Sequence, residues 1–507
     1  MPSAGVRRRT ARAGMLIGAG GALFIGLATV LSPVIAAMII GGAILACLAL
    51  QDLSLLVSAT LLFNMAGEPY RFAYQSISLG GLDLYPNDLL LLLLAGALLL
   101  KALRAGRVPS MPRDSISIVL LCYLAYGLFT LARSLPIHGS ASFSAFRVQY
   151  FYGLLFFLSL PVLADRRSRR RLFVTVLIGA AWISLLGIYN VATGSFVGGR
   201  TSSHTYRYLS SLQALAVFCG LSLLAGTIWS RRRSLGVVLL GTLYVAGILI
   251  SQARSIWLGA LLGMLTAVFI TRHWRRSLAR LVLPAAAVLL LFVLLGSISG
   301  QGDLVQGIAT RATSLIAAPE DLTTVWRLFV WNEALQQLKA SPILGLGLGQ
   351  PFVYFDIVQN YWEDSRQLHN TYLELAYTSG AIAAMLFIAF QGMVFWRLVT
   401  TARRRASAAR TPLLLALASC QVCLAAAAFA NVVGASMVST IYVWILSAVI
   451  VVEAREAAAD GHPEAVKCRA DAVKRHDDGV ESGDAAADGR GSLADDRGSV
   501  TKPGETV

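Results

Sequence analysis

Apolar segments that carry almost no charge recur along the chain, and many are close to the roughly 20 residues that cross a bilayer as a helix. Of the 507 residues, 56% are hydrophobic and 14% are charged, and the mean hydropathy is +0.66. A soluble domain normally carries about 25% charged residues. The composition therefore excludes an ordinary soluble enzyme and predicts an all-α, polytopic integral membrane protein.

We predict about 12–14 transmembrane helices from these segments. They lie near 14–31, 33–49, 51–64, 86–103, 115–133, 147–164, 172–191, 209–229, 235–251, 254–271, 279–297, 376–397, 412–431 and 434–453. The stretch 33–64 leaves the number between twelve and fourteen.

Basic residues account for the formal net charge of +16, and they gather in short loops between the apolar segments. If every predicted span crosses, all the main clusters fall on one side of the membrane. These clusters are Arg7–Arg12, Lys101–Arg113, Arg166–Arg171, Arg231–Arg233, Arg272–Arg276 and Arg397–Arg410. The positive-inside rule makes that side cytoplasmic and places both termini there. This arrangement is typical of membrane topology, and we expect no nucleic-acid partner.

The chain divides into five predicted regions. Residues 1–13 form a basic cytoplasmic N-terminus, 14–297 hold transmembrane helices with short loops, and 298–375 form one large loop on the outer side. Residues 376–453 hold the C-terminal transmembrane helices, and 454–507 form a polar tail that we expect to be disordered.

Within the large loop, apolar residues at helical spacing predict a helix from Leu322 to Lys339, and a second helix is expected to begin near Asn370. Gly345, Gly347 and Gly349 lie between them. A nucleotide-binding fingerprint would need a glycine in place of Gln350 and a preceding strand in the cytosol, so these glycines indicate a tight turn instead.

Several arginines lie on the outward side, where the positive-inside rule predicts few basic residues. They are Arg71, Arg133, Arg147, Arg200, Arg207, Arg254, Arg311, Arg327 and Arg366. A guanidinium presents a planar fork of donors that suits phosphate oxygens. Arg254, in a very short turn between two spans, and Arg327, on the predicted loop helix, are the main candidates for an anion site. Arg200 and Arg207 precede a span and could join the same patch, whereas snorkelling to the interface is the structural alternative.

His369 opens the second predicted helix of the loop. A helix N-terminus disfavours the imidazolium ion, so His369 is expected to stay neutral and to serve as a base. A simple capping or surface role is the alternative. Cys420 and Cys423 form a CxxC pair on an apparent membrane helix, with no further ligand nearby, and indicate small core- or lipid-facing residues.

Together these motifs resemble the superfamily of O-antigen ligases and O-antigen polymerases, which are bacterial membrane glycosyltransferases. The resemblance covers roughly 200–450 and is carried by four motifs: Ser251-Gln-Ala-Arg254-Ser-Ile-Trp257, Trp326-Arg327 with Trp331, Ser341-Pro342-Ile-Leu-Gly345-Leu-Gly347-Leu-Gly349, and His369-Asn370-Thr-Tyr372-Leu-Glu374 with Gly380.

The resemblance implies a catalytic loop at the periplasmic face of the bacterial inner membrane. It implies a donor glycan on undecaprenyl diphosphate, whose diphosphate Arg254 and Arg327 would hold, and it makes His369 the candidate base. Neither a metal nor a cofactor is expected. The expected partners are this donor, a glycan, lipid or protein acceptor, membrane lipids and polysaccharide-assembly proteins.

The sequence leaves several functions open. A ligase that moves finished glycan to an acceptor is favoured over a polymerase of O-antigen or exopolysaccharide repeat units. A transporter or flippase for lipid-linked glycan is the alternative from another class. Ion-coupled transporters usually bury Asp or Glu at mid-membrane to bind H⁺ or Na⁺. The predicted spans here are almost free of acidic residues, and Asp52 and Asp88 lie near span ends. A scaffold without chemistry of its own is the third alternative, and the outward arginines argue against it.

Overall fold

The computed structural model describes residues 52–67, 76–79, 82–106, 113–193, 200–202, 205–207, 209–229, 234–270, 308, 313, 322–356, 360–365, 367–404, 410–431, 433 and 436–460. Several predictions lie outside these residues. They are the spans near 14–31, 33–49 and 279–297, the basic clusters at 7–12, 231–233 and 272–276, Arg71, Arg311, Arg366 and the tail after 460.

Helices make up most of the described chain. In order they are α3 (Leu53–Gly67), α4 (Pro86–Ala105), α5 (Ser115–His138), α6 (Ser140–Gln149), α7 (Leu154–Leu163), α8 (Arg166–Thr193), α9 (Ser211–Leu224), α10 (Leu235–Ile250), α11 (Arg254–Ile270), α14 (Leu322–Leu338), α15 (Thr371–Arg404), α16 (Thr411–Ala430) and α17 (Met437–Asp460). A 3₁₀ turn, η2 (Phe151–Gly153), joins α6 to α7, and a π-helical segment, η3 (Ala225–Trp229), follows α9.

Antiparallel hairpins account for the strands in the described residues. They pair β1 (Ile77–Leu79) with β2 (Leu82–Leu84), β3 (Arg200–Ser202) with β4 (Thr205–Arg207), and β5 (Phe352–Asp356) with β6 (Tyr361–Ser365). The β5–β6 hairpin lies inside the predicted large loop, where sequence periodicity had indicated only helices.

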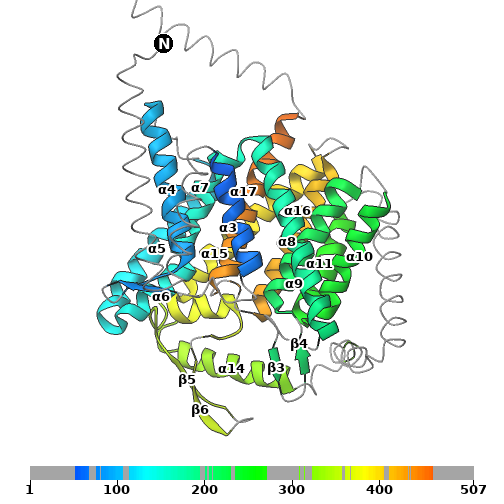
Figure 1. Ribbon diagram of the computed structural model, residues 1–507. Coiled ribbons are helices and arrows are strands. Elements are labelled where there is room, and N and C mark those ends of the chain that lie inside the picture. Colours follow the sequence, from blue (N-terminus) through cyan, green and yellow to red (C-terminus); the bar gives the residue numbers. More distant parts are fainter. Residues whose placement is uncertain are drawn as a thin grey trace, which may run out of the picture.

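Within the described residues, five helical stretches are long and apolar enough to cross a membrane, and one of them joins α6, η2 and α7. They span Ser115–His138, Ser140–Leu163, Arg166–Thr193, Thr371–Arg403 and Thr411–Ala430. Shorter apolar helices are Leu53–Gly67, Ser211–Thr227, Leu235–Ile250 and Arg254–Ile270. The apolar helices stand side by side in one bundle, while α14 lies across one end of it beside the β3–β4 and β5–β6 hairpins (Figure 1). The predicted all-α, polytopic membrane fold is confirmed.

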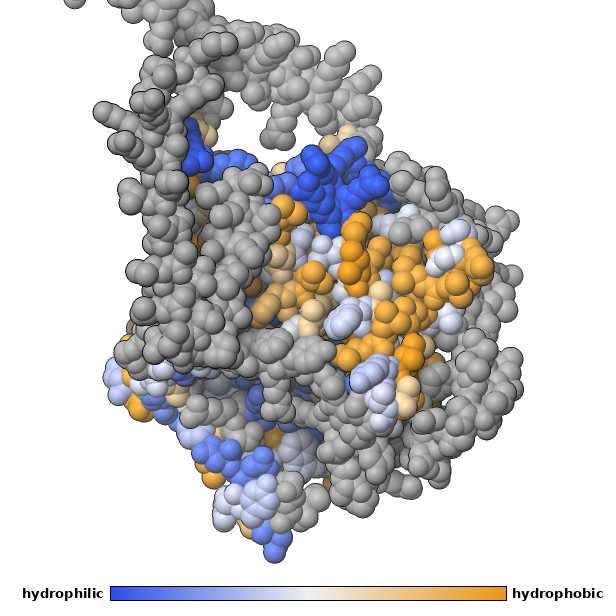
Figure 2. Space-filling view, viewed as in Figure 1, coloured by the Kyte–Doolittle hydropathy of each residue, from blue (hydrophilic) through white to orange (hydrophobic). Residues whose placement is uncertain are grey.

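Ion pairs gather at the end of the bundle where α8 begins and α17 ends. Arg169 pairs with Glu453 and Glu456, at 2.6 Å each, and Arg410 lies 2.9 Å from Glu456. Arg455 pairs with Asp114, just before α5. The basic clusters around residues 101–113, 166–171 and 397–410 therefore meet at one end, as the topology predicts. Figure 2 shows a hydrophilic cap there above an apolar band.

These ion pairs also extend the last helix. The polar tail was expected to begin after Ala454, but α17 continues to Asp460. Because Glu453 and Glu456 pair with Arg169 and Arg410 on α8 and at the start of α16, the last turns of α17 are held against the bundle. The segment that follows Ala454 is thus helical for its first residues.

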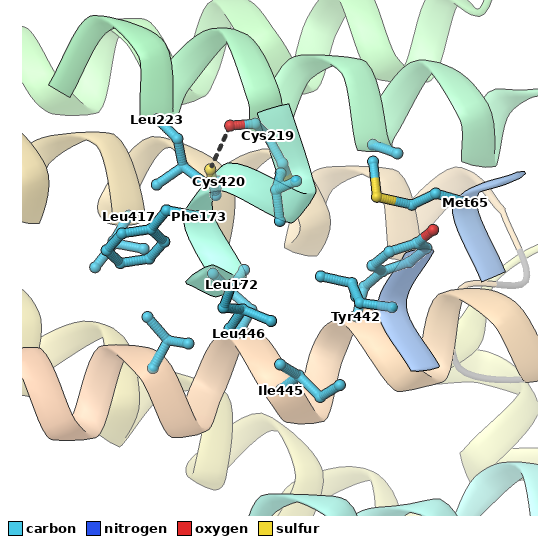
Figure 3. Close-up of a pocket in the computed structure, with 14 residues that line it drawn as sticks. Met65, Leu172, Phe173, Cys219, Leu223, Leu417, Cys420, Tyr442, Ile445 and Leu446 are labelled. Carbon is cyan, nitrogen blue, oxygen red and sulfur yellow. Dashed lines mark hydrogen bonds between the residues drawn. The ribbon is translucent and has the colours of Figure 1, made fainter. Parts of the chain in front are cut away.

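An apolar cavity of about 50 Å³ lies within the bundle. Its lining comes from α3, α8, α9, α16 and α17 and includes Met65, Phe173, Cys219, Cys420 and Tyr442 (Figure 3). Cys420 and Cys423 are buried free thiols, in agreement with the core-facing role predicted for them. None of the residues that line this cavity belongs to the predicted anion site or is the candidate base.

Candidate active site

His369 occupies a strained turn directly before α15. Its backbone φ is +52°, a conformation that residues other than glycine seldom adopt. The next residue, Asn370, caps the helix, since its Oδ1 accepts hydrogen bonds from the backbone N–H groups of Tyr372 at 3.0 Å and Leu373 at 3.1 Å. The helix expected near Asn370 is confirmed, and His369 stands one residue outside its cap.

Helix α14 places two tryptophans against this turn. The indole of Trp326 meets the imidazole of His369 edge to face, with ring centroids 5.6 Å apart. Trp331, farther along the same helix, donates from Nε1 to the carbonyl of Leu368 at 2.9 Å. Arg327 directly follows Trp326 and is half-buried. The loop helix predicted from Leu322 therefore brings Trp326 to the candidate base, and Arg327 is the next residue of the same helix.

Arg254 is the first residue of α11, at the same end of the bundle. The turn before it is buried, and Gln252 adopts a positive φ of 49° within it. Trp257 closes the turn by donating from Nε1 to the carbonyl of Ile248 at 2.9 Å. The very short connection predicted between the two spans is thus a buried, hydrogen-bonded turn, and α11 begins directly after it.

Asn431, which directly follows α16, joins the Arg254 segment to the His369 segment. Its Nδ2 donates to Ser255 Oγ at 2.7 Å, and its backbone carbonyl accepts a hydrogen bond from Thr371 Oγ1 at 3.1 Å. Ser255 is the neighbour of Arg254, and Thr371 lies two residues after His369. Sequence reasoning missed Asn431, because an asparagine after an apolar helix is an ordinary cap and nothing local marks its partners.

A break in α15 explains the three glycines of the loop. At Gly380 the backbone leaves helical geometry, with φ +83° and ψ 176°. The carbonyls that this break exposes accept hydrogen bonds from Leu346 N at 2.8 Å, Gly347 N at 2.9 Å and the Tyr126 hydroxyl at 2.9 Å. Backbone groups at membrane depth need such partners. The tight turn predicted over residues 345–349 is confirmed, and its role is to dock onto the broken helix.

Two other outward arginines have structural partners. Arg133 donates from Nη2 to the carbonyls of Leu344 at 2.6 Å and Gly345 at 3.0 Å, so it fastens the glycine turn to α5. Arg147, which is only 2% exposed, pairs with Asp88 at 3.1 Å. The Tyr152 hydroxyl donates to the other oxygen of this carboxylate at 2.8 Å. Outward position alone therefore does not mark an arginine as an anion ligand.

Arg200 and Arg207 face each other as backbone partners in the β3–β4 hairpin. Their side chains lie outside the described part of the chain, so a place in the same patch stays a prediction. Among the residues that the structure describes, no three His, Cys, Asp or Glu side chains gather in a group that could hold a metal ion.

Fold and site together define an all-α polytopic membrane protein with a candidate base and two arginines at one end of its helix bundle. Residues 235–388 match the Wzy_C family model, described as O-antigen ligase. Over this stretch the chain is similar to the O-antigen ligases, and the match supports the resemblance to the O-antigen ligase and polymerase superfamily, whose members are membrane-bound and glycosyltransferase-like. The match includes Arg254, Arg327 and His369 and leaves out Arg200 and Arg207. No curated protein matches the chain.

Proposed function

We propose that this protein is an O-antigen ligase-like glycosyltransferase that moves a glycan from undecaprenyl diphosphate to an acceptor hydroxyl. The observation that carries the proposal is the placement of His369. The turn that holds it lies against Trp326, the residue before Arg327, and is linked through Asn431 to the segment of Arg254. These candidate residues come from three separate stretches of the matched region, and the fold gathers them at one end of the bundle.

The chemistry needs a base and a fixed positive charge. The acceptor hydroxyl oxygen attacks the anomeric carbon of the donor sugar, its proton passes to the imidazole of His369, and the bond from that carbon to the diphosphate breaks. The lipid diphosphate leaves with the electron pair. Guanidinium groups of Arg254 and Arg327 stabilise the negative charge that develops on it, as fixed electrostatic partners do in other active sites.

The orientation in the membrane belongs to the same proposal. The basic clusters and their acidic partners lie at one end of the bundle, and the site lies at the other. With the basic end in the cytoplasm, the candidate site faces the periplasm of a bacterial inner membrane. A lipid-linked donor would then meet the arginines from the membrane plane.

The direct test uses purified full-length protein with one lipid-linked repeat unit, first alone and then with a candidate acceptor, read on a glycan gel. Labelling of the acceptor alone supports the ligase, whereas a ladder of longer lipid-linked products makes the protein a polymerase. Movement of labelled lipid-linked glycan across vesicles without new glycosidic bonds would support the transporter instead.

Variants tie the activity to the site. We expect His369→Ala and Arg254→Ala each to lower transfer by at least about 100-fold at equal membrane levels. Arg403→Ala, exposed near the opposite end of α15, is the matched control and should transfer normally. Near-normal transfer by either site variant would remove that residue from the proposed mechanism.

A further inference from the structure

The peptide unit that precedes His369 influences how its imidazole is presented. His369 has a backbone φ of +52°, and φ is the rotation about the bond from its own nitrogen to its Cα. Because a peptide unit is planar, a contact that fixes the carbonyl of Leu368 also fixes the plane from which this rotation is measured. A positive φ at a residue other than glycine persists only where its surroundings impose it. The partner of the Leu368 carbonyl therefore bears on the conformation of the candidate base.

That partner is the indole of Trp331, on α14. Its Nε1 donates to the carbonyl oxygen of Leu368 at 2.9 Å, across a separation of 37 residues in the sequence. Leu368 is only 1% exposed and belongs to the same hydrophobic cluster as Val330 and Ala334 of α14. A backbone carbonyl buried away from water requires a donor, and here the donor comes from the loop helix.

The indole of Trp331 is itself held by the helix bundle. Its ring meets the ring of Phe429, in the last turn of α16, edge to face, with centroids 5.3 Å apart and planes inclined by 74°. Two residues after Phe429, the carbonyl of Asn431 accepts the hydroxyl of Thr371 at 3.1 Å. The end of α16 thus contacts the turn on both sides of His369, through Trp331 before the histidine and through Thr371 after it.

We propose that Trp331 is a positioning residue for His369, because its indole N–H holds the Leu368 carbonyl and with it the left-handed turn that presents the imidazole. This inference rests on the proposed role of His369 as base. It assigns Trp331 no contact with substrate and no proton transfer. The hydrogen bond to Leu368 and the ring contact with Phe429 are separate interactions, so a variant can remove the first and keep the second.

Two replacements of Trp331 remove the donor and keep an aromatic ring. Trp331→Phe lacks the N–H, and β-(3-benzothienyl)alanine in place of Trp331 exchanges it for sulfur at nearly the same shape. For both we expect single-turnover transfer at saturating donor to fall at least about fivefold, because the buried carbonyl loses its partner. The donor concentration for half-maximal rate should change less than about twofold, since no substrate contact is removed. Trp362→Phe, the same change at a 70% exposed indole on β6, is the control and should transfer normally.

The reactivity of the imidazole gives a second readout that does not depend on glycan transfer. Diethyl pyrocarbonate carbethoxylates accessible imidazoles, and mass spectrometry of peptides reports each histidine separately. A turn that opens locally should let His369 react at least about threefold faster in both Trp331 variants than in the wild type. His138, at the end of α5, is the internal reference and should react at an unchanged rate.

An unchanged rate of His369 carbethoxylation in both variants would overturn the inference. So would a loss of transfer in Trp331→Phe that benzothienylalanine restores, because ring shape and not the N–H would then matter. If Trp331→Phe does not fold, the benzothienylalanine protein carries the test. His369→Ala distinguishes the two proposals. If it is inactive while both Trp331 variants transfer normally, only the positioning role fails; if it transfers normally, the role of His369 as base fails, and carbethoxylation still decides the positioning role.

Discussion

The indole of Trp326 lies against the imidazole of His369, with ring centroids 5.6 Å apart and ring planes inclined by 63°. The two residues are far apart in the sequence: Trp326 lies on α14, and His369 lies in the turn before α15. Trp326 also approaches Tyr354 of the β5–β6 hairpin, at a centroid distance of 6.5 Å. The indole that contacts the candidate base is therefore itself in contact with the hairpin.

Removing this ring should loosen the imidazole without removing it. We expect Trp326→Ala to lower glycan transfer about tenfold, since edge-to-face ring pairs contribute about 0.5–1.5 kcal/mol beyond the area they bury. Trp326→Phe keeps an aromatic edge and should recover most of the rate. Transfer assays at matched protein levels check this. Equal rates in the alanine variant and the wild type would show that the indole does not position His369.

The hydrogen bonds of Asn431 to the Arg254 and His369 segments predict that a change at Asn431 lowers glycan transfer. Asn431→Ala removes the hydrogen bond to Ser255 Oγ, beside Arg254, while its backbone contact with Thr371 remains. We expect a roughly five- to tenfold lower transfer rate, because one neutral hydrogen bond contributes about 1 kcal/mol. The control is Thr400→Ala, a half-buried residue whose hydroxyl donates to carbonyls within α15. A loss of the same size in the control would mean that the effect is not specific to the link.

The break in α15 predicts a strict need for glycine. At Gly380 a Cβ atom would stand 1.9 Å from the carbonyl oxygen of Ile343, and φ is +83°. Gly380→Ala should therefore destabilise the protein by at least about 2 kcal/mol, from backbone strain alone. Gly392, in the same helix, has open space around its would-be Cβ, so Gly392→Ala is the matched control. Melting temperatures in detergent compare the two variants. Equal melting temperatures for Gly380→Ala and Gly392→Ala would contradict the prediction that the break in α15 requires glycine.

The Arg147–Asp88 pair predicts a large effect on stability. Asp88 is 3% exposed, and Arg147→Ala would leave its charge buried without its cationic partner. We expect a loss of about 3 kcal/mol or more in the free energy of unfolding. The double variant Arg147→Met with Asp88→Asn removes both charges and should recover part of this loss. Arg104→Ala, exposed at the end of α4, should change stability little. A loss no larger than that of Arg104→Ala would refute the prediction.

The ion pairs at the basic end predict an acid-sensitive contribution to stability. Burial alone would raise the pKa of Glu456, but hydrogen bonds from Arg169 and Arg410 outweigh it and hold the pKa below the ordinary value of 4.5. A lowered pKa stabilises the folded state above the unfolded value, and this stability is lost as the pH falls through the folded value. Because the Glu456 side chain is 25% exposed, we expect its ion pairs to contribute about 1 kcal/mol to the free energy of unfolding.

Glu456→Gln should therefore melt below the wild type at pH 7, and the difference should shrink as the pH drops below about 4.5. Melting of both proteins in the same detergent across this range measures the effect. A difference that stays constant with pH would show that the carboxylate charge does not contribute. Glu333→Gln, on the outer helix α14, serves as the control, with no ion pair among the described residues.

Local sequence signals predicted much of the structure of the large loop over residues 298–375. The helix over Leu322–Leu338, the cap at Asn370 and the glycine turn each depend on residues within a few positions of one another. The β5–β6 hairpin was missed, although its strands are rich in aromatic residues such as Phe352, Phe355 and Trp362. Strands of five residues are too short for alternation to compete with a helical interpretation.

The sequence by itself determined the class of protein, the position of the apolar spans and the end of the bundle that carries the basic clusters. Those properties depend on composition and on local order, because a bilayer selects for apolar length and for charge between spans. Only the tertiary structure decided which outward arginines support the fold and which stay candidates for substrate. Arg133, for example, binds carbonyls more than 200 residues away, and such contacts leave no local pattern for a sequence to show.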